Sequence, residues 1–380
     1  MRTEKLYEKD SYRVTFTATV LSCVPAEKGY SVILDKTAFF PQQGGQYADK
    51  GNLNGQNVTD VQIENDEIVH YVDSPFTEGE QVAGAIDRMT RFVRMQTHTG
   101  EHILSGVIHN LYGYDNVGFH LGDGYATVDT SGPLTKEQIA RAEEEANRVV
   151  WEDRAVYATY PTLEELKTIS YRSKIDPRED IRLIHIDGCD VCACCAPHLS
   201  STGQVGLIKV VAAEPRKKGT RLTVLCGSDA YANFVRTQNL AQEVQRMLSA
   251  TPDTLVAEIK RTLDRLAEKE KEIKSLKVTC ALSSLSFVSA PACDYAFIEN
   301  ADLDVLRATA LSVTTENIRA LLSENDGLIS YVVFSSSADV RPFVKTMNAA
   351  LNGKGGGSAT FAQGKLSTKK EDVSAFLKNP

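Results

Sequence analysis

Two histidine residues, His98 and His102, are four residues apart in the segment QTHTGEHILSG, residues 96–106. Apolar residues around them recur at three- and four-residue steps, which predicts a helix that ends at Gly113. On a helix, residues four apart lie on one face, so both imidazoles could bind one metal ion. The pair alone is weak support for a metal site, because two hydrogen-bonded histidines on a half-buried helix would have the same spacing.

A second pair of metal-ligand residues follows about ninety residues later, with Cys194 and His198 in VCACCAPHLSSTG, residues 191–203. Together the two pairs offer one sulfur and three nitrogens, a tetrahedral set that suits a single Zn²⁺ ion per chain. The spacing to His198 favours Cys194, although Cys192 or Cys195 could take its place. A structural zinc usually joins local cysteine pairs, whereas these pairs are far apart in the chain, which is more typical of an active-site floor.

Other polar residues near these pairs are candidates for the same pocket. Glu101 precedes His102 and could act as a general base, or it could lie on the exposed side of the helix. His109 lies on the same stripe as His102 but about 10 Å further along the helix, too far to bind the same ion. His120, in the segment VGFHLGDG, is a further candidate pocket residue.

Composition limits the class of protein. The chain has 380 residues, a net charge of −8 and a pI near 5.5, so it is an acidic protein that would not coat nucleic acid indiscriminately. The N-terminal residues lack the apolar core of a secretory signal, and no stretch has the eighteen or so apolar residues of a membrane span. The eight cysteines then suggest reduced thiols or metal ligands. We expect a cytoplasmic protein with no membrane partner.

The pattern along the chain predicts a multidomain α+β protein. Residues 1–88 have the alternating pattern of a small β-barrel-like domain. Residues 89–227 predict helices backed by a mostly antiparallel sheet. Residues 228–278 have apolar residues at helical steps among alternating charges, as in a helical hairpin or coiled-coil arm. Residues 279–380 alternate strands and helices, as in an α/β domain.

Two glycine clusters interrupt these patterns. Gly44 and Gly45 lie in FFPQQGGQYADKG, residues 39–51, where glycine can adopt positive φ and let a ligand or another backbone come close. A simple β-turn is an equally good interpretation of this segment. The second cluster is GKGGG, residues 353–357.

The order of these motifs resembles that of the long-form AlaX-type alanyl-tRNA editing proteins. These are free-standing relatives of the editing and C-terminal domains of alanyl-tRNA synthetase. The resemblance rests on the two metal-ligand pairs, the TGxxG after His198, the two glycine clusters and KKGTRLTVLCG, residues 217–227. It covers essentially the whole chain and implies a zinc-containing α/β editing domain and a C-terminal DHH-associated domain. Aminoacylation is not expected, because no synthetase catalytic domain precedes residue 1.

The resemblance also implies an activity and a set of site residues. The expected reaction is hydrolysis of the ester that joins serine or glycine to the 3′ adenosine of tRNA(Ala). Zinc could activate water or anchor the substrate's amino group, and four protein ligands would leave no vacant position for water. Glu101 departs from the family, which more often has an uncharged polar residue there. By residue match, the zinc ligands would be His98, His102, Cys194 and His198, and the pocket residues would be Gly44, Gly45 and Gln46.

An acidic chain that binds tRNA must gather its cations locally. Arg88, Arg91 and Arg94 precede the histidine pair, and Lys217 and Lys218 lie in a basic cluster. Lys354 lies in the C-terminal glycine cluster, in the domain that in the synthetases helps to bind tRNA and to form dimers; a homodimer through the arm and this domain is therefore expected. Ordinary solvated surface is an equally good interpretation of any one of these cations.

Two other functions are compatible with parts of the sequence. A noncatalytic zinc-containing module would bind tRNA without releasing serine. A phosphoesterase is suggested by the C-terminal domain alone, but the chain contains neither an Asp-His-His motif nor the acidic metal cluster that such enzymes use.

Overall fold

The computed structural model describes residues 3–122, 124–173 and 181–379. The chain forms two compact units, Met1–Gln242 and Glu243–Pro380. The boundary between them falls inside helix α5, Gly227–Leu248. The finer division of the chain into four domains remains a prediction.

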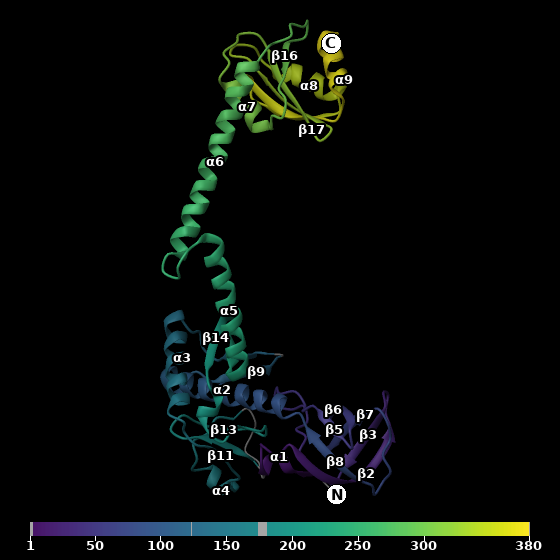
Figure 1. Cartoon of the computed structure of the whole chain (residues 1–380), viewed down its shortest axis with the longest axis vertical. Helices are drawn as coiled ribbons and strands as arrows, with labels where there is room; N and C mark the ends of the chain where they lie inside the picture. The colour runs from purple at the N-terminus through teal and green to yellow at the C-terminus, as the bar shows by residue number, and fades with distance from the viewer. Residues whose placement is uncertain (1–2, 123, 174–180, 380) are drawn as a thin grey trace. The chain divides into compact units, whose positions relative to one another are not determined.

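The first unit begins with a closed six-stranded barrel (Figure 1). The predicted alternation is present in its first strand, β2, where Phe16, Ala18 and Val20 are buried and the residues between them are more exposed. Since successive side chains of a strand point to opposite faces, this pattern fills the barrel interior from one side of each strand. In barrel order the strands are β2 (Thr15–Pro25), β3 (Tyr30–Leu34), β7 (Glu67–Val72), β6 (Gln56–Glu64), β5 (Gly51–Leu53) and β8 (Gln81–Ile86).

Helix α2, Arg88–Tyr112, follows the barrel directly and carries the histidine pair. It begins where Asp87 accepts a hydrogen bond from the backbone N–H of Thr90, at 2.9 Å. It ends, as predicted, at Gly113, which has φ of 70° and closes the last turn in the left-handed conformation.

Residues 95–108 of α2 are buried on every side of the helix, not only on one face. Two antiparallel sheets, helix α3 (Lys136–Trp151) and a loop of the barrel pack around it. Glycines permit this close approach: a Cβ atom at Gly100 would lie 2.4 Å from Sγ of Cys226, and one at Gly106 would lie 2.8 Å from the carbonyl oxygen of Cys189.

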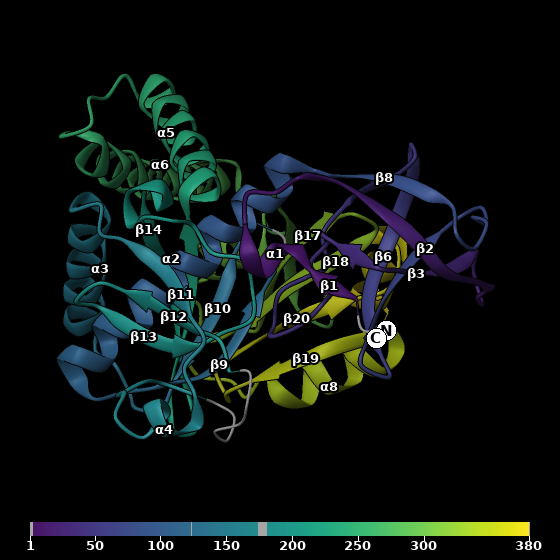
Figure 2. The same cartoon turned by 90° about the horizontal axis from the view of Figure 1, so that it is seen from below.

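The two sheets around α2 are both antiparallel, as the sequence predicts for this region. The four-stranded sheet has the order β14 (Ile208–Arg216), β15 (Gly219–Cys226), β10 (Ala126–Thr130) and β9 (Asn116–Leu121). The three-stranded sheet consists of β11 (Val156–Thr159), β12 (Leu183–Ile186) and β13 (Asp190–Ala193). Figure 2 labels β9 to β14 in the same region as α2 and α3. Shorter elements complete this unit: β1 (Glu4–Lys5), α1 (Leu6–Lys9), β4 (Lys36–Thr37), α4 (Leu163–Leu166) and the 3-10 helix Thr202–Val205.

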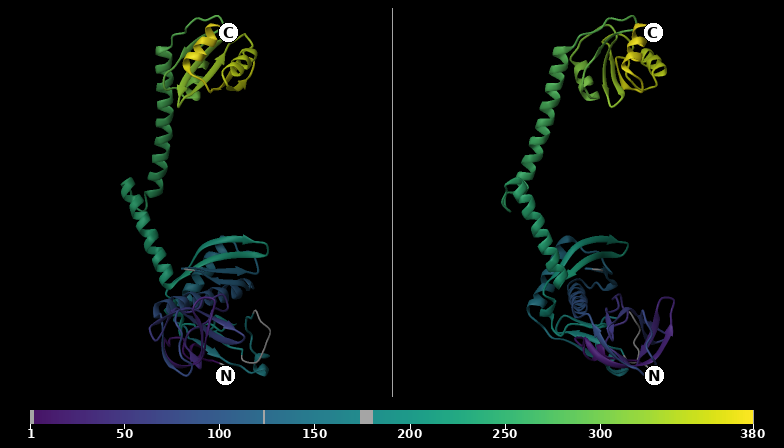
Figure 3. Two further views of the ribbon diagram at one scale, coloured as in Figure 1. Left: turned by 90° about the vertical axis from the view of Figure 1, so that its right-hand side faces the viewer. Right: turned by 45° about the vertical axis from the view of Figure 1, so that its right-hand side comes forward.

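The second unit contains the long helix α6, Leu255–Ser284, and a five-stranded mixed sheet (Figure 3). Strand β18 shows why both faces of this sheet are covered. Its residues Ile329, Tyr331 and Val333 pack with helices α8 and α9, and Val332 and Phe334 pack with α7 and the end of α6. The elements are β16 (Asp294–Phe297), α7 (Leu303–Leu311), β17 (Arg319–Asn325), β18 (Leu328–Phe334), α8 (Arg341–Ala350), β19 (Gly353–Gly357), β20 (Phe361–Leu366) and α9 (Lys370–Lys378), with sheet order β16-β17-β18-β20-β19.

Two further expectations from the sequence concern the cysteine thiols and membrane-spanning helices. All eight cysteines lie in the described part of the chain, and each is a free thiol. Among the described residues, no helix combines the length and the apolar character that crossing a membrane requires.

Candidate metal centre

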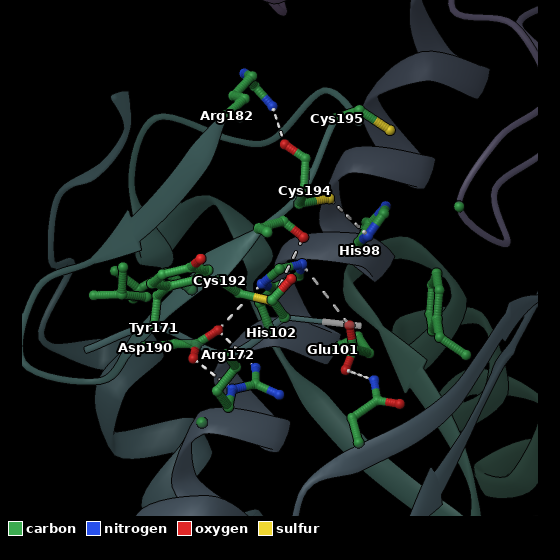
Figure 4. Close-up of a pocket in the computed structure, with 18 of the residues that line it drawn as sticks. His98, Glu101, His102, Tyr171, Arg172, Arg182, Asp190, Cys192, Cys194 and Cys195 are labelled. Carbon is green, nitrogen blue, oxygen red and sulfur yellow. Dashed lines mark hydrogen bonds and ion pairs between the residues drawn. The ribbon is translucent and has the colours of Figure 1, made fainter. Parts of the chain in front are cut away.

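The structure brings together the four residues that the sequence offers as metal ligands. One donor atom from each of His98, His102, Cys194 and His198 lies within 4.8 Å of the others. The Sγ atom of Cys194 is 3.6 Å from Nε2 of His98 and 3.3 Å from Nε2 of His198. Two residues come from α2, and two come from the loop that follows β13, so the site joins distant parts of the chain (Figure 4).

Each histidine is held by a second residue through its other ring nitrogen. Nδ1 of His98 contacts Oε1 of Gln46 at 2.7 Å. Nδ1 of His102 contacts Asp190 at 3.2 Å, and Nδ1 of His198 contacts the Thr99 hydroxyl at 3.1 Å. Such contacts fix the tautomer and the orientation of a metal-bound imidazole, and they leave Nε2 for the ion. This donor set, with its outer contacts, fits Zn²⁺.

The protonation of two of the donors, Cys194 and His198, suits a metal. Burial raises the pKa of the Cys194 thiol, but the neighbouring His98 and His198 outweigh burial and hold this pKa well below its ordinary value. Burial lowers the pKa of His198 to about 3, so its imidazole is neutral. A thiolate and a neutral imidazole are the forms that bind zinc.

Asp190, which contacts His102, also forms an ion pair with Arg172. Burial raises its pKa, but His102 and Arg172 outweigh burial and lower the pKa to about 2. Arg172 donates two hydrogen bonds of 2.7 Å to the Asp190 carboxylate, one to each oxygen. The carboxylate is therefore ionised and fixed where it contacts His102.

The other cysteines of the loop point elsewhere or form a separate group. Cys195 packs among the residues of the barrel core, and burial raises its pKa to about 12. Cys192 lies within 4.8 Å of His102 and Asp190, but not within the set of four. Cys194 is therefore the thiol that shares a site with all three histidines.

The glycine motif forms a tight turn that reaches this centre. Gly44 and Gly45 have φ of 62° and 83°, and Gln43 and Gln46 form backbone hydrogen bonds to each other on either side of them. The motif is a tight turn, as one interpretation of the sequence expects. The turn also brings this segment to the candidate metal centre, because it places the buried Gln46 side chain against His98. Nε2 of Gln46 is also buried and has no hydrogen-bond partner among the described residues.

A pocket of about 1280 Å³ is lined by three of the four donors, His98, His102 and Cys194. Glu101 lines it and is only 4% exposed, so this residue does not lie on the exposed side of the helix. The walls combine aromatic, basic and acidic side chains, which suits a polar substrate of some size. The lining residues include Lys5, Gln43, Gly44, His98, Glu101, His102, His109, Asn116, Phe119, Tyr160, Tyr171, Arg172, Arg182, Asp190 and Cys194.

Two other histidines are not part of the centre. His109 lies at the edge of the pocket and contacts Asp115 at 2.9 Å. His120 is exposed on β9, and its ring lies edge-on to that of Tyr47, 5.8 Å away. His120 is not among the residues that line the pocket.

The predicted tRNA contacts differ sharply in exposure. Arg91 is buried and donates to the Asp49 carboxylate and to the carbonyl oxygens of Ser11 and Ala38, so the expected phosphate contact at Arg91 is replaced by a buried ion pair. The side chain of Arg94 is 11% exposed and donates to the carbonyl oxygen of Ala48. The cations that remain exposed are Arg88, Lys217, Lys218 and Lys354.

Several residues of the centre have no signal in the sequence. Thr99 contacts His198, and Asp190 contacts His102, in each case from a distant part of the chain. Arg172 contacts Asp190, which is 18 residues away. Asn116, which contacts Glu101, lies in the next strand after α2. No local spacing marks such residues, since the contacts exist only after the sheets pack on the helix.

Comparison with known proteins supports the family resemblance. Residues 8–90 match the family model of class II tRNA synthetases (A), and residues 181–222 match that of the threonyl and alanyl tRNA synthetase second additional domain. The first region includes the barrel, and the second includes Cys194 and His198.

Named relatives align with almost the whole chain. The alanyl-tRNA editing protein AlaX-L of Pyrococcus horikoshii is 29% identical over 97% of this chain and 96% of its own length. The alanine–tRNA ligase of Pyrobaculum neutrophilum is 32% identical over 99% of this chain, which spans 44% of the ligase. The alanine–tRNA ligase of Pyrococcus abyssi is 30% identical, and the chain spans 43% of it.

Proposed function

Because the chain is an AlaX-type relative of the alanyl-tRNA synthetases, we propose that it is a trans-editing hydrolase. Its substrates are tRNA(Ala) molecules mischarged with serine, chiefly, and with glycine. In this proposal it hydrolyses the aminoacyl ester in a zinc-dependent reaction, as an aminoacyl-tRNA deacylase. The chain aligns with 96% of the editing protein and with 44% and 43% of the two ligases.

One observation carries this proposal: four metal-donor side chains converge beside a large pocket, and each histidine among them is oriented by a further residue. A purely structural site would need no pocket. When bound, zinc would supply either positive charge near the ester carbonyl or an anchor for the amino group of the substrate.

The reaction makes modest demands on the protein. The oxygen of water bonds to the ester carbonyl carbon, and the bond from that carbon to the ribose oxygen breaks. The ribose oxygen receives one proton of the water, and the amino acid leaves as a free acid. The ester is already activated, so the site mainly has to hold it against water and stabilise the developing oxyanion. Gln46, Asp190 and Thr99 contribute by holding the three imidazoles in fixed orientations.

Binding of tRNA is assigned to the exposed cations. Lys217 and Lys218 lie at the tip of the hairpin formed by β14 and β15, and Arg88 lies at the start of α2. Lys354 lies on β19, at an edge of the sheet of the second unit. Phosphate groups are the ligands that such exposed cations would bind.

A homodimer is also proposed, through the helical arm and the C-terminal domain. Apolar side chains of α6 that a partner helix could cover are more than a third exposed in the single chain: Ile259, Leu263, Leu266 and Ile273. Their steps of four, three and seven residues suit packing against another helix.

The experiment that tests the function measures release of labelled serine from Ser-tRNA(Ala), with Ala-tRNA(Ala) as the parallel substrate and with protein of known zinc content. The proposal predicts rapid release of serine and slow release of alanine. Stoichiometric zinc and tight tRNA binding without release of serine would instead identify a noncatalytic tRNA-binding module.

A further inference from the structure

We propose that Glu101 forms a binding subsite for the α-ammonium group of the aminoacyl ester. This inference rests on the proposed function and deepens it, because it assigns one part of the substrate to one carboxylate. The ester presents an ammonium, a side chain and a ribose, and Glu101 would recognise the ammonium, which all amino acid substrates share.

The position of Glu101 places its carboxylate at the metal centre. It lies three residues after His98 on α2, so it is a neighbour of that donor on the helix surface. Its Oε2 atom is 4.0 Å from Nε2 of His102. Figure 4 shows the Glu101 and His102 side chains side by side, and both line the same pocket.

The two carboxylate oxygens have different surroundings. Oε1 accepts hydrogen bonds from the Ser105 hydroxyl and from Nδ2 of Asn116, the latter at 2.6 Å. These donors fix the side chain in one orientation and leave Oε2 directed toward the donors of the metal centre. Within residues 3–122, 124–173 and 181–379, no lysine or arginine forms an ion pair with this carboxylate.

A buried carboxylate is costly unless positive charge lies near it. His102 is the ion-pair partner of Oε2, at 4.0 Å, and an ammonium group of a ligand would add a compact cation that donates hydrogen bonds to this oxygen. An ammonium group fits this requirement, since it donates up to three hydrogen bonds and is compact. Glu101 is not one of the four clustered donors, which separates this role from that of a metal ligand.

The alternative role for Glu101 is that of a general base toward water. A base would accelerate hydrolysis of any ester that reaches the pocket, with or without an ammonium group. An ammonium subsite would favour only substrates that carry the charge. This difference gives an experiment that distinguishes the two roles.

The test compares two substrates with the zinc-loaded full-length chain. One is Ser-tRNA(Ala), and the other is its α-hydroxy analogue, in which a hydroxyl replaces the ammonium. The variant is Glu101→Gln, because the glutamine oxygen can still accept the bonds from Ser105 and Asn116. Glu145→Gln, the same change on helix α3 at a residue that does not line the pocket, is the matched control.

The readout is the ratio of kcat/KM for the two substrates, compared between wild type and variant, so that the intrinsic reactivity of each ester cancels. Loss of a charge-assisted contact predicts that the ratio falls by about 10- to 100-fold in Glu101→Gln. The ratio should stay unchanged in Glu145→Gln. Zinc content should remain at one equivalent in both variants.

Equal losses for both substrates, with an unchanged ratio, would overturn the inference and identify a base. Loss of zinc from Glu101→Gln would also overturn it. If the wild-type chain hydrolyses neither ester, the proposed function fails, and the inference is then tested by binding. The probe is 3′-seryl-amido adenosine with its α-hydroxy counterpart: a weakened preference for the ammonium form in Glu101→Gln supports the subsite, and an unchanged preference overturns it.

Discussion

Oε1 of Gln46 lies 2.7 Å from Nδ1 of His98, and this contact joins the glycine turn after β4 to the candidate metal centre on α2. The turn therefore contributes to the geometry of a donor from which it is 52 residues away in the chain. Because the contact fixes one imidazole, it should affect metal affinity even though Gln46 is not a metal ligand.

Replacement of Gln46 by alanine should lower zinc affinity by about 10- to 100-fold, since His98 loses the partner that orients its ring. Competition with a chromophoric chelator measures this change. Gln42→Ala, an exposed glutamine of the same loop, is the control and should bind zinc like the wild type. Equal affinities for Gln46→Ala and the wild type would show that the contact does not position His98.

Gly45→Ala should destabilise the first unit more than Gly55→Ala. Both glycines have positive φ, 83° and 81°, so both variants incur the same conformational cost of about 1 kcal/mol. At Gly45 the new Cβ would also lie 2.5 Å from the carbonyl oxygen of Phe119, whereas at Gly55 no atom lies within 4 Å. The clash should add roughly 1–3 kcal/mol in urea unfolding and reduce zinc content. Similar unfolding of the two variants would contradict this account of the turn.

Arg91→Ala should reduce the free energy of unfolding of the first unit by about 3–5 kcal/mol, because it removes the arginine that donates hydrogen bonds to the buried Asp49 carboxylate. Arg88→Ala, at an exposed position on the same helix, should change stability by less than about 0.5 kcal/mol. Denaturant unfolding measures both. A stable Arg91→Ala protein with weakened tRNA binding would show that Arg91 contacts tRNA and does not stabilise the fold through Asp49.

Reversal of the hairpin charges, Lys217→Glu with Lys218→Glu, should weaken tRNA binding and reduce the salt dependence of log Kd by about 2. The control is Lys260→Glu with Lys271→Glu on α6, which changes the net charge by the same amount. Binding at several salt concentrations separates the two. If both pairs weaken binding equally, only net charge matters and the hairpin is not a specific contact.

The barrel should become less stable in acid because of His70. Burial lowers the pKa of His70 to about 4, and the ring contacts the Thr37 hydroxyl and the Val32 carbonyl oxygen. Above pH 6.5 the histidine is neutral in both folded and unfolded chains, so it has no pH-dependent effect. As pH falls from 6.5 to 4, only the unfolded chain gains the proton, and stability should fall by roughly 3 kcal/mol.

His70→Gln removes this titration. In metal-free protein the variant should therefore show a flatter dependence of unfolding free energy on pH between 6.5 and 4 than the wild type. Parallel curves for the two proteins would show that His70 does not titrate on unfolding.

The sequence predicts the elements of the site better than their surroundings. Apolar spacing and Gly113 define helix α2 correctly, because these features act locally. Residue type and spacing also select four residues that meet in the structure: His98, His102, Cys194 and His198.

The sequence does not predict which polar side chains become buried when other elements pack on α2. Arg91 has the sequence context of a surface cation, yet a loop of the barrel covers it and supplies Asp49. Asp190 and Asn116 reach the site only because strands pack on both sides of α2. Such contacts depend on tertiary packing, to which helical periodicity is insensitive.

The central claim is that the four clustered donors hold a metal that deacylation requires. The most direct measurement adds zinc stepwise to metal-free protein and follows bound zinc together with serine release from Ser-tRNA(Ala). We predict that release rises in proportion to zinc up to one equivalent, and that His98→Ala neither binds this equivalent nor releases serine. Release by metal-free protein at the rate of the zinc-loaded protein would contradict the account.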